Sequence, residues 1–375
     1  MPKFTAIEPI EKSELEKMGF LWHQDKDGEY IVRESLLTLS IEEALAYERA
    51  ANELYRMYEK GAEYVIEKNL FCALDIPDSL VCGIKKSWRD ERSNHLYGRF
   101  DLSGGIDGRA IKLIEFNADT PTLLLETALI QWMLLEKSQL KDAVQFNRVY
   151  EAISHKIGKI SASHKGEFSR LLLSSVKGID EERETVKLLQ NMAKDAGVVT
   201  HFCYLEDIGI DEKQVLDEYE NRYDFLFKLY PWEDMKDFPM QLETKMLNPL
   251  YTLLYQSKGM LAILYRLFPD SPYLVPASFE PLASKYVRKR AFGREGANID
   301  IVAESGELLR QTAGEYADYK SLYQEYIEFV QDEEGRYYQA GVFYSDGACG
   351  IGFRRGAEIL DDMSQFVGHL VLSTS

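Results

Sequence analysis

The sequence predicts a mixed fold, α+β combined with α/β, in which a small parallel sheet accompanies antiparallel strands. Residues 169–230 alternate between strand-like and helical segments in the order β-α-β-α-β, which is typical of a parallel sheet. Residues 97–119 have the pattern of two strands joined by a Gly-rich loop. From about residue 285 onward, alternating apolar residues and Gly-rich connections indicate further antiparallel strands.

The N-terminal part begins with a predicted hairpin and a long helix. The segments GFLWH and EYIVR flank residues 25–28, and the Asp-Gly step there is a turn signal, so a hairpin is expected over residues 18–33. Ser40 and Glu43 form a capping-box pattern, after which apolar residues recur at helical spacing through Val65.

Two strands and a helix are expected next. The strands YGRFDL and RAIKLIEFNAD are joined by the loop Ser103 to Gly108. A helix is predicted to start directly afterwards, with Thr120 as its N-cap and Pro121 at its first helical position.

The remaining helices are predicted from periodicity and stop signals. A helix from Glu181 to Ala196 ends at Gly197, and the region around Asp211 is expected to supply the second helix of the β-α-β-α-β unit. Residues 250–268 and residues 317–328 are also predicted to be helical.

Composition excludes several classes of function. The net charge of −18 is unsuited to general nucleic-acid binding and to anionic membranes. No apolar run is long enough for a transmembrane helix, and the N-terminus lacks the apolar segment of a signal peptide. Four scattered cysteines without CxxC spacing indicate no disulfide framework and no zinc site. A cytoplasmic location is therefore expected.

The first candidate site is a polar strand face. Residues two apart on a strand point to the same side, roughly 6.5–7 Å apart, so Glu115 and Asn117 project together. In a hairpin, Asp101 joins that face, and these oxygen ligands suit Mg²⁺, with Arg99 placed to stabilise phosphoryl charge. From spacing alone, a solvated strand face explains the same residues at least as well.

Two further patterns are also open to structural explanations. The segment KRAFGREGAN places Gly293 and Gly296 in a loop between strands, where amides can fold over phosphates, but an ordinary hairpin turn has the same pattern. Glu181 and Glu182 lie at a helix start, where the helix dipole favours acids without any function. Neither a Walker A motif nor a GxSxG nucleophile elbow occurs.

Together these segments resemble the synthetase part of glutathionylspermidine synthase and its bacterial single-domain relatives, which are described as acid–amine ligases. The resemblance covers roughly residues 19–355. Its motifs, in order, are RFDL, IEFNADTPT, DEER, KLYPWE, LFPDSPYL and KRAFGREGANID. Each motif is modest alone, but their order and spacing are specific.

The resemblance implies an ATP-grasp fold with the metal-binding strands early in the chain and the ATP lysines late. It implies ATP and Mg²⁺ as cofactors, an acid and an amine as substrates, and no nucleic-acid or membrane partner. The residues it implies are the catalytic arginines Arg99 and Arg355, the metal ligands Asp101, Glu115 and Asn117, the ATP-binding residues Lys258, Lys289 and Gln339, the flexible loop Gly293, Arg294, Glu295, Gly296, Ala297 and Asn298, and the substrate-binding residues Thr120, Thr122, Glu181 and Glu182.

The resemblance also implies a division of the chain. Residues 1–168 would hold the metal-binding strands, residues 169–240 a small α/β subdomain and residues 241–375 the ATP-binding lobe. One departure concerns substrate specificity, because Leu229 and Asp234 stand where a glutathione-specific relative has threonines.

The implied reaction is the ADP-forming ligation of a carboxylic acid to an amine through an acyl phosphate. A peptide or cell-envelope amine as acceptor is one alternative. A nucleotide-binding partner protein without catalysis is another. The sequence assigns neither substrate and no oligomeric state.

Overall fold

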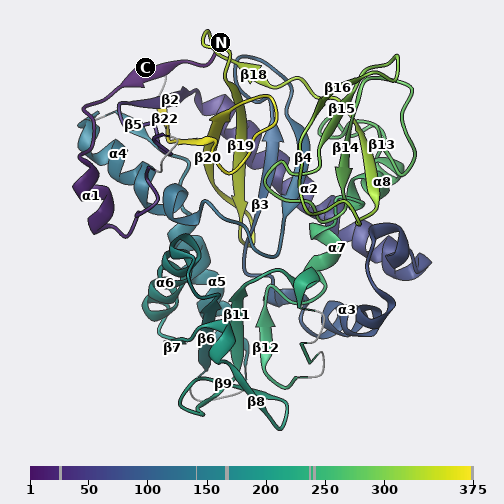
Figure 1. Ribbon diagram of the computed structural model, residues 1–375. Helices are drawn as coiled ribbons and strands as arrows, with labels where there is room; N and C mark the ends of the chain where they lie inside the picture. Colours follow the sequence, from purple (N-terminus) through teal and green to yellow (C-terminus); the bar gives the residue numbers. More distant parts are fainter. Residues whose placement is uncertain (25–27, 141, 165–168, 236–237, 240–241, 373–375) are drawn as a thin grey trace.

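The computed structural model describes residues 1–24, 28–140, 142–164, 169–235, 238–239 and 242–372. Within these residues, five sheets and a set of helices make up a mixed α/β fold (Figure 1). In the described part of the chain, no helix combines the length and the apolar character needed to cross a membrane.

An antiparallel sheet forms the centre of the molecule, in the order β21-β20-β19-β3-β4 with β18 paired to β19. It draws strands from both ends of the sequence, so the regions 1–168 and 241–375 share one sheet. Its strands are β3 (Gly98–Ser103), β4 (Lys112–Asn117), β18 (Val330–Gln331), β19 (Tyr337–Tyr344), β20 (Ala348–Gly356) and β21 (Gln365–Val367).

The long helix α2 (Ile41–Lys68) covers one face of this sheet. The predicted capping box is confirmed, because the Ser40 side chain accepts from the Glu43 N–H while the Glu43 carboxylate accepts from the Ser40 N–H. Tyr58 packs edge-on against Phe100 and Phe116, whose rings stack 3.8 Å apart on the inner face of β3 and β4. This apolar face leaves the opposite face of the two strands for polar side chains.

A second antiparallel sheet lies beside β4, in the order β13-β17-β14-β15-β16. Helix α8 (Met260–Leu267) packs against it, following α7 (Thr252–Gln256). The strands are β13 (Ala277–Ser278), β14 (Tyr286–Arg290), β15 (Asp300–Val302), β16 (Leu308–Gln311) and β17 (Ser321–Glu325).

The predicted parallel sheet is confirmed in the order β12-β11-β6-β7, at the bottom of Figure 1. Its strands are β6 (Arg170–Ser175), β7 (Val199–Phe202), β11 (Phe225–Leu229) and β12 (Lys245–Leu247). Helices α5 (Val149–Ser163) and α6 (Asp180–Asp195) pack together beside it. An adjoining small sheet contains β8 (Gly209–Asp211), β9 (Gln214–Leu216) and β10 (Arg222–Tyr223).

The other elements complete the frame. A four-stranded sheet joins the two ends of the chain in the order β1-β2-β22-β5, with β1 (Phe4–Ala6), β2 (Ser35–Leu39), β5 (Ala143–Val144) and β22 (His369–Leu372). The remaining helices are α1 (Lys12–Lys17), α3 (Asp78–Asp90), α4 (Gln131–Ser138) and the short η1 (Phe71–Leu74), η2 (Arg92–Asn94), η3 (Glu126–Ile130), η4 (Leu205–Asp207) and η5 (Trp232–Asp234).

Two predicted helices are wrong. Around Asp211 the chain forms the β8–β9 hairpin, because Glu212 and Lys213 adopt positive φ angles of 45° and 72° and turn the chain back. Residues 317–328 contain β17, whose alternate residues Leu322 and Gln324 are buried between β13 and β14. Tertiary pairing overrides the helix propensity of Lys, Gln and Glu in both places.

Three other predictions need adjustment. The helix expected at Thr120 begins instead near Leu124, because Leu123 has a left-handed φ of 66°. The helix over 250–268 is interrupted between α7 and α8. In the hairpin expected over residues 18–33, an isolated antiparallel bridge joins Gln24 and Glu29, while Ile31 pairs with Phe366, and residues 25–27 of the turn lie outside the described residues.

Candidate active site

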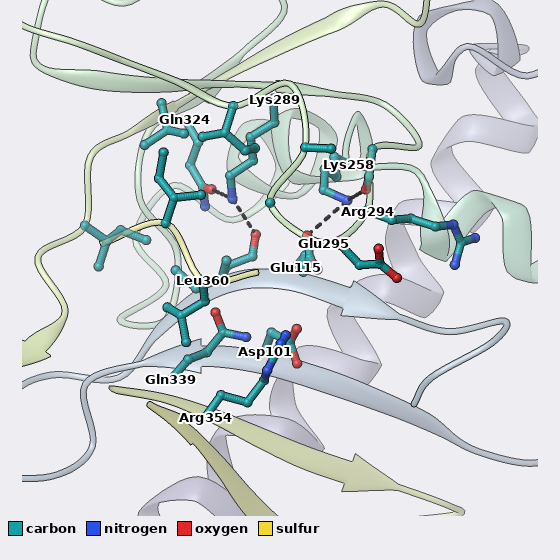
Figure 2. A pocket seen from close by; sticks show the side chains of 18 of the residues that line it. Asp101, Glu115, Lys258, Lys289, Arg294, Glu295, Gln324, Gln339, Arg354 and Leu360 are labelled. Carbon is teal, nitrogen blue, oxygen red and sulfur yellow. Dashed lines mark hydrogen bonds and ion pairs between the residues drawn. The ribbon is translucent and has the colours of Figure 1, made fainter. Parts of the chain in front are cut away.

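A pocket lies between the central sheet and the sheet that contains β14 and β17 (Figure 2). It encloses about 1190 Å³ of atom-free space, open solvent included. Its polar lining comes from β3, β4, β14, β17, β19 and β20, together with the α7–α8 connection and the loop after β14.

The acidic wall of the pocket is built by β3 and β4. Their register places Asp101 opposite Glu115 and Arg99 opposite Asn117, on the face away from the stacked phenylalanines. Arg99 binds both carboxylate oxygens of Asp101, at 2.7 and 2.9 Å. The Asn117 Nδ2 donates to Asp101 Oδ2 at 3.1 Å and to Glu115 Oε1 at 3.3 Å. The strand face predicted from spacing is therefore one connected polar group.

Two lysines form the opposite wall. Lys258 lies in the break between α7 and α8, and its Nζ is 3.0 Å from Glu115 Oε2 while also donating to the Gly293 carbonyl. Lys289 on β14 donates to Gln324 Oε1 at 2.7 Å and to the Ile114 carbonyl at 3.1 Å. The interruption of the predicted helix over 250–268 is what directs Lys258 into the pocket.

The charges of the two walls are coupled. Burial alone would raise the pKa of Glu115, but the nearby charges of Lys258 and Lys289 outweigh it and lower that pKa to about 2. Burial lowers the pKa of Lys289 to about 8, partly offset by Glu115. Among the described residues, the hydrogen-bond partners of Lys289 are neutral oxygens, so an anionic ligand beside it would be stabilised.

The Gly-rich loop joins β14 to β15 and covers one side of the pocket. Gly293, Arg294, Glu295, Gly296 and Ala297 line it. Arg294 donates to Thr120 Oγ1 at 3.0 Å and forms an ion pair with Glu233 of η5, which connects the loop to two other parts of the chain.

Asn298 does not line the pocket. Its Oδ1 accepts the backbone N–H of Tyr316 at 2.8 Å, and its φ of 53° places it at the end of the turn. The side chain therefore fixes the loop rather than facing a ligand.

Thr120 and Thr122 both line the pocket. Arg99 Nη1 donates to the Thr122 carbonyl at 2.9 Å, which ties this segment to β3. The Thr120 hydroxyl binds Arg294 instead of capping a helix.

Glu181 and Glu182 occupy the first turn of α6, outside the residues that line the pocket. Burial raises the pKa of Glu181 to about 8. The negative charge of Glu126 adds to this increase, and the positive charge of Arg354 opposes it. Burial raises the pKa of Glu182 to about 7, while Arg294 acts in the opposite direction. Both glutamates thus interact electrostatically with arginines of the pocket.

The late-chain arginine in the pocket is Arg354, and Arg355 lies elsewhere. Arg355 donates to Asp332 Oδ2 at 3.0 Å and to Glu334 Oε2 at 2.6 Å, on the other side of β20. Successive strand residues point to opposite faces, so a shift of one position separates the two side chains.

Sequence reasoning also missed Gln324 and an apolar wall that includes Val287, Ile301 and Leu360. Gln324 was not identified because residues 317–328 were predicted to form a helix. In the structure, alternate residues of β17 are buried, which is the pattern of a strand. Gln339, which the resemblance implied, does line the pocket.

The residues present fit a Mg²⁺ ion. Two carboxylates and one amide converge, and the Asn117 amide nitrogen lies within hydrogen-bond distance of both carboxylates. An amide presents either its nitrogen or its oxygen after a half-turn, so all three residues can offer the hard oxygen ligands that Mg²⁺ prefers.

The family model described as glutathionylspermidine synthase preATP-grasp matches residues 3–372. The chain belongs to this family. A protein of Haemophilus influenzae named “Putative acid--amine ligase” is 33% identical over 344 residues, which cover 86% of each chain. The bifunctional glutathionylspermidine synthetase/amidase of Escherichia coli is 27% identical, and the match covers 94% of this chain but 60% of that protein.

Within the solved structures, the apo form of a glutathione synthetase-like effector from Globodera pallida shares the fold of this family member. The two chains superpose with a TM-score of 0.57 at 10% identity, covering 90% of this chain and 89% of the effector. At that identity the similarity shows the fold alone.

Proposed function

We propose that this chain is an ATP-dependent carboxylate–amine ligase with an ATP-grasp arrangement, in which two sheets clamp the nucleotide. The observation that supports it most is the pocket itself. The acidic group Asp101, Glu115 and Asn117 faces Lys258 and Lys289 across a space bordered by the Gly-rich loop. This pairing of hard oxygen ligands with lysines suits a Mg²⁺–triphosphate.

The proposed reaction has two steps. A substrate carboxylate oxygen attacks the γ-phosphorus of ATP, the bond to the β–γ bridging oxygen breaks, and ADP leaves an acyl phosphate behind. The amine nitrogen then attacks the carbonyl carbon, phosphate departs, and the nitrogen loses a proton to form the amide. No protein nucleophile is needed, which agrees with the absence of a nucleophile motif in the sequence.

Each group of side chains has a role in this scheme. Lys258 and Lys289 hold the phosphates, and Arg99 and Arg354 stabilise the negative charge that spreads during phosphoryl transfer. The apolar wall would receive the adenine base, and the loop around Gly296 would exclude water from the reactive acyl phosphate.

Asp101, Glu115 and Asn117 are the residues that would hold Mg²⁺. When bound, the ion supplies positive charge to phosphate oxygens. Arg99 and Lys258 form ion pairs with the carboxylates of Asp101 and Glu115.

The test is ADP release with Mg·ATP across a panel of acids crossed with amines. Glutathione, γ-glutamyl peptides and polyamines belong in the panel, and glutathione is not assumed, because Leu229 is buried in the apolar core where a relative has a threonine. ADP release that requires one acid and one amine would establish the ligase. ATP binding without turnover across the panel would instead support a non-catalytic partner protein.

A pair of variants ties the activity to this pocket. Glu115→Gln should lower ADP release by about 10²–10³-fold, the range observed when one charge-stabilising group is removed. Glu307→Gln, an exposed change in the β15–β16 turn, is the matched control and should behave like the wild type. Full ATP turnover by Glu115→Gln would rule out the assignment.

A further inference from the structure

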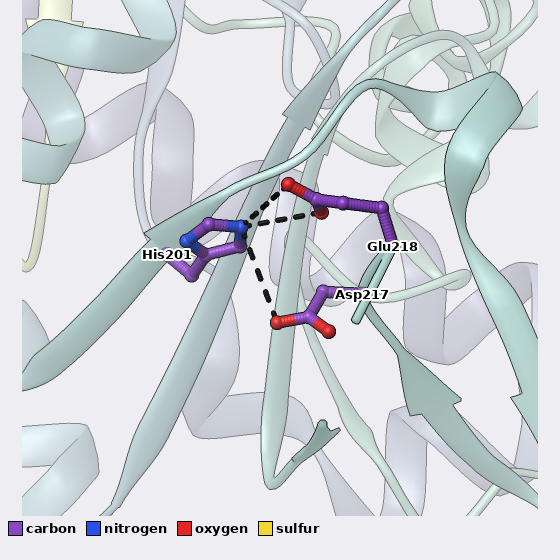
Figure 3. A group of neighbouring side chains, drawn as sticks. All are labelled: His201, Asp217 and Glu218. Atoms are coloured by element: carbon purple, nitrogen blue, oxygen red, sulfur yellow. Dashed lines mark hydrogen bonds and ion pairs between the residues drawn. The ribbon is translucent and has the colours of Figure 1, made fainter. Parts of the chain in front are cut away.

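A group of metal-ligand side chains lies outside the pocket, on the small sheets of residues 199–223. His201 projects from β7, and Asp217 and Glu218 follow β9 (Figure 3). None of the three lines the nucleotide pocket. The ligase reaction proposed above makes no use of them.

The imidazole points directly at both carboxylates (Figure 3). His201 Nε2 is 3.0 and 3.2 Å from the two oxygens of Glu218 and 4.0 Å from Asp217 Oδ2. Two ligands bound at about 2.0–2.1 Å to one ion lie roughly 3.0–3.4 Å apart in octahedral or tetrahedral geometry. The His–Glu pair already has this spacing, and Asp217 reaches it with a shift of roughly 1 Å.

Hydrogen bonds hold the Asp217 carboxylate in place. Asp217 is 3% exposed and accepts hydrogen bonds from the Tyr223 hydroxyl at 2.7 Å and from the backbone N–H groups of Tyr219 and Asn221 at 2.9 Å. Glu218 also interacts with the thiol of Cys203, which directly follows β7. Surrounding hydrogen bonds of this kind orient ligands in known metal sites.

We propose that His201, Asp217 and Glu218 form a second metal site, which takes a divalent transition-metal ion such as Zn²⁺. The imidazole nitrogen decides the class of ion, because nitrogen ligands suit Zn²⁺ and its neighbours while Mg²⁺ prefers oxygen. Two acidic groups supply the compensating negative charge. The ion would link strand β7 to the connection between β9 and β10. Its open coordination positions would face solvent, because His201 and Glu218 are each about one-third exposed.

The proposal does not depend on the ligase activity, so the experiment measures metal binding directly. Zn²⁺ is titrated calorimetrically into the whole chain in the presence of millimolar Mg²⁺, which competes for the proposed catalytic site. The expected result is one Zn²⁺ ion per chain in the wild type, with affinity lowered at least tenfold in both His201→Gln and Glu218→Gln.

His164→Gln is the matched control, because His164 on the same small lobe faces, among the described residues, one carboxylate, that of Asp224, at 3.6 Å. It should bind Zn²⁺ like the wild type. The exposed thiols of Cys72 and Cys82 are present in every variant, so only binding that depends on His201 and Glu218 counts. Equal binding in all variants, or none in the wild type, would overturn the proposal and leave a His–carboxylate ion pair. If one variant fails to fold, the other decides.

Discussion

Replacing Lys228 with methionine should destabilise the protein far more than replacing an exposed lysine. The Lys228 Nζ lies 3.0 and 3.2 Å from the two oxygens of Asp119, and both side chains are 0% exposed. The ammonium also donates to the Tyr230 carbonyl and lies 4.1 Å from the centre of the Trp232 ring. This group joins β11 to the segment that follows β4.

The expected cost follows from burial. Removing one partner of a buried ion pair typically costs about 3–5 kcal/mol, because the other charge is left without compensation in the interior. After the substitution, Asp119 keeps the Trp232 N–H at 2.9 Å as a donor. Burial already raises the pKa of Asp119 even beside Lys228, so this carboxyl will take up a proton readily, and the loss should lie near the lower end of the range.

Urea denaturation followed by tryptophan fluorescence measures the free energy of unfolding. Lys177→Met is the matched control, because Lys177 is 51% exposed and pairs with a 39% exposed Asp207, so its loss should be within about 1 kcal/mol. The double variant Lys228→Met with Asp119→Asn should lose less free energy of unfolding than the two single variants lose in sum. A loss for Lys228→Met no greater than for Lys177→Met would refute the reasoning.

Three other outcomes are expected. Arg354→Ala should reduce ADP release by roughly 10²-fold, whereas Arg355→Ala should retain wild-type turnover and lose only its ion pairs with Asp332 and Glu334, and the reverse order would show that the pocket is wrongly assigned. Gly296→Ala should weaken ATP binding by about tenfold in calorimetry and should also lower the urea midpoint, because a Cβ would lie 2.6 Å from the Leu360 carbonyl at a φ of +69°, where a side chain is strained. Burial raises the pKa of Glu181 from 4.5 to about 8, so the folded state holds a proton that the unfolded state releases, and stability should fall as pH rises between those values. Urea denaturation across that pH interval should show a smaller loss of stability for Glu181→Gln than for the wild type. Equal losses in the two proteins would contradict the assigned burial.

Local signals in the sequence were sufficient where one segment decides its own structure. The Ser40–Glu43 capping box and the β3–β4 hairpin depend on neighbouring residues, and both formed as predicted. The polar face with Asp101 and Glu115 also followed from the two-residue period of a strand. The helices predicted near Asp211 and over 317–328 failed, because there the choice of structure depends on distant partner strands.

The sequence by itself determined the mixed fold, the parallel sheet, the acidic strand face and, through its motifs, the family. Only the tertiary structure decided which side chains meet. It brought Lys258 to Glu115 across 143 positions of sequence, selected Arg354 over Arg355, and placed Gln324 beside Lys289. Strand and helix periods fix the direction of a side chain relative to its own element, whereas its partners depend on how separate sheets pack, and packing is a property of the whole chain.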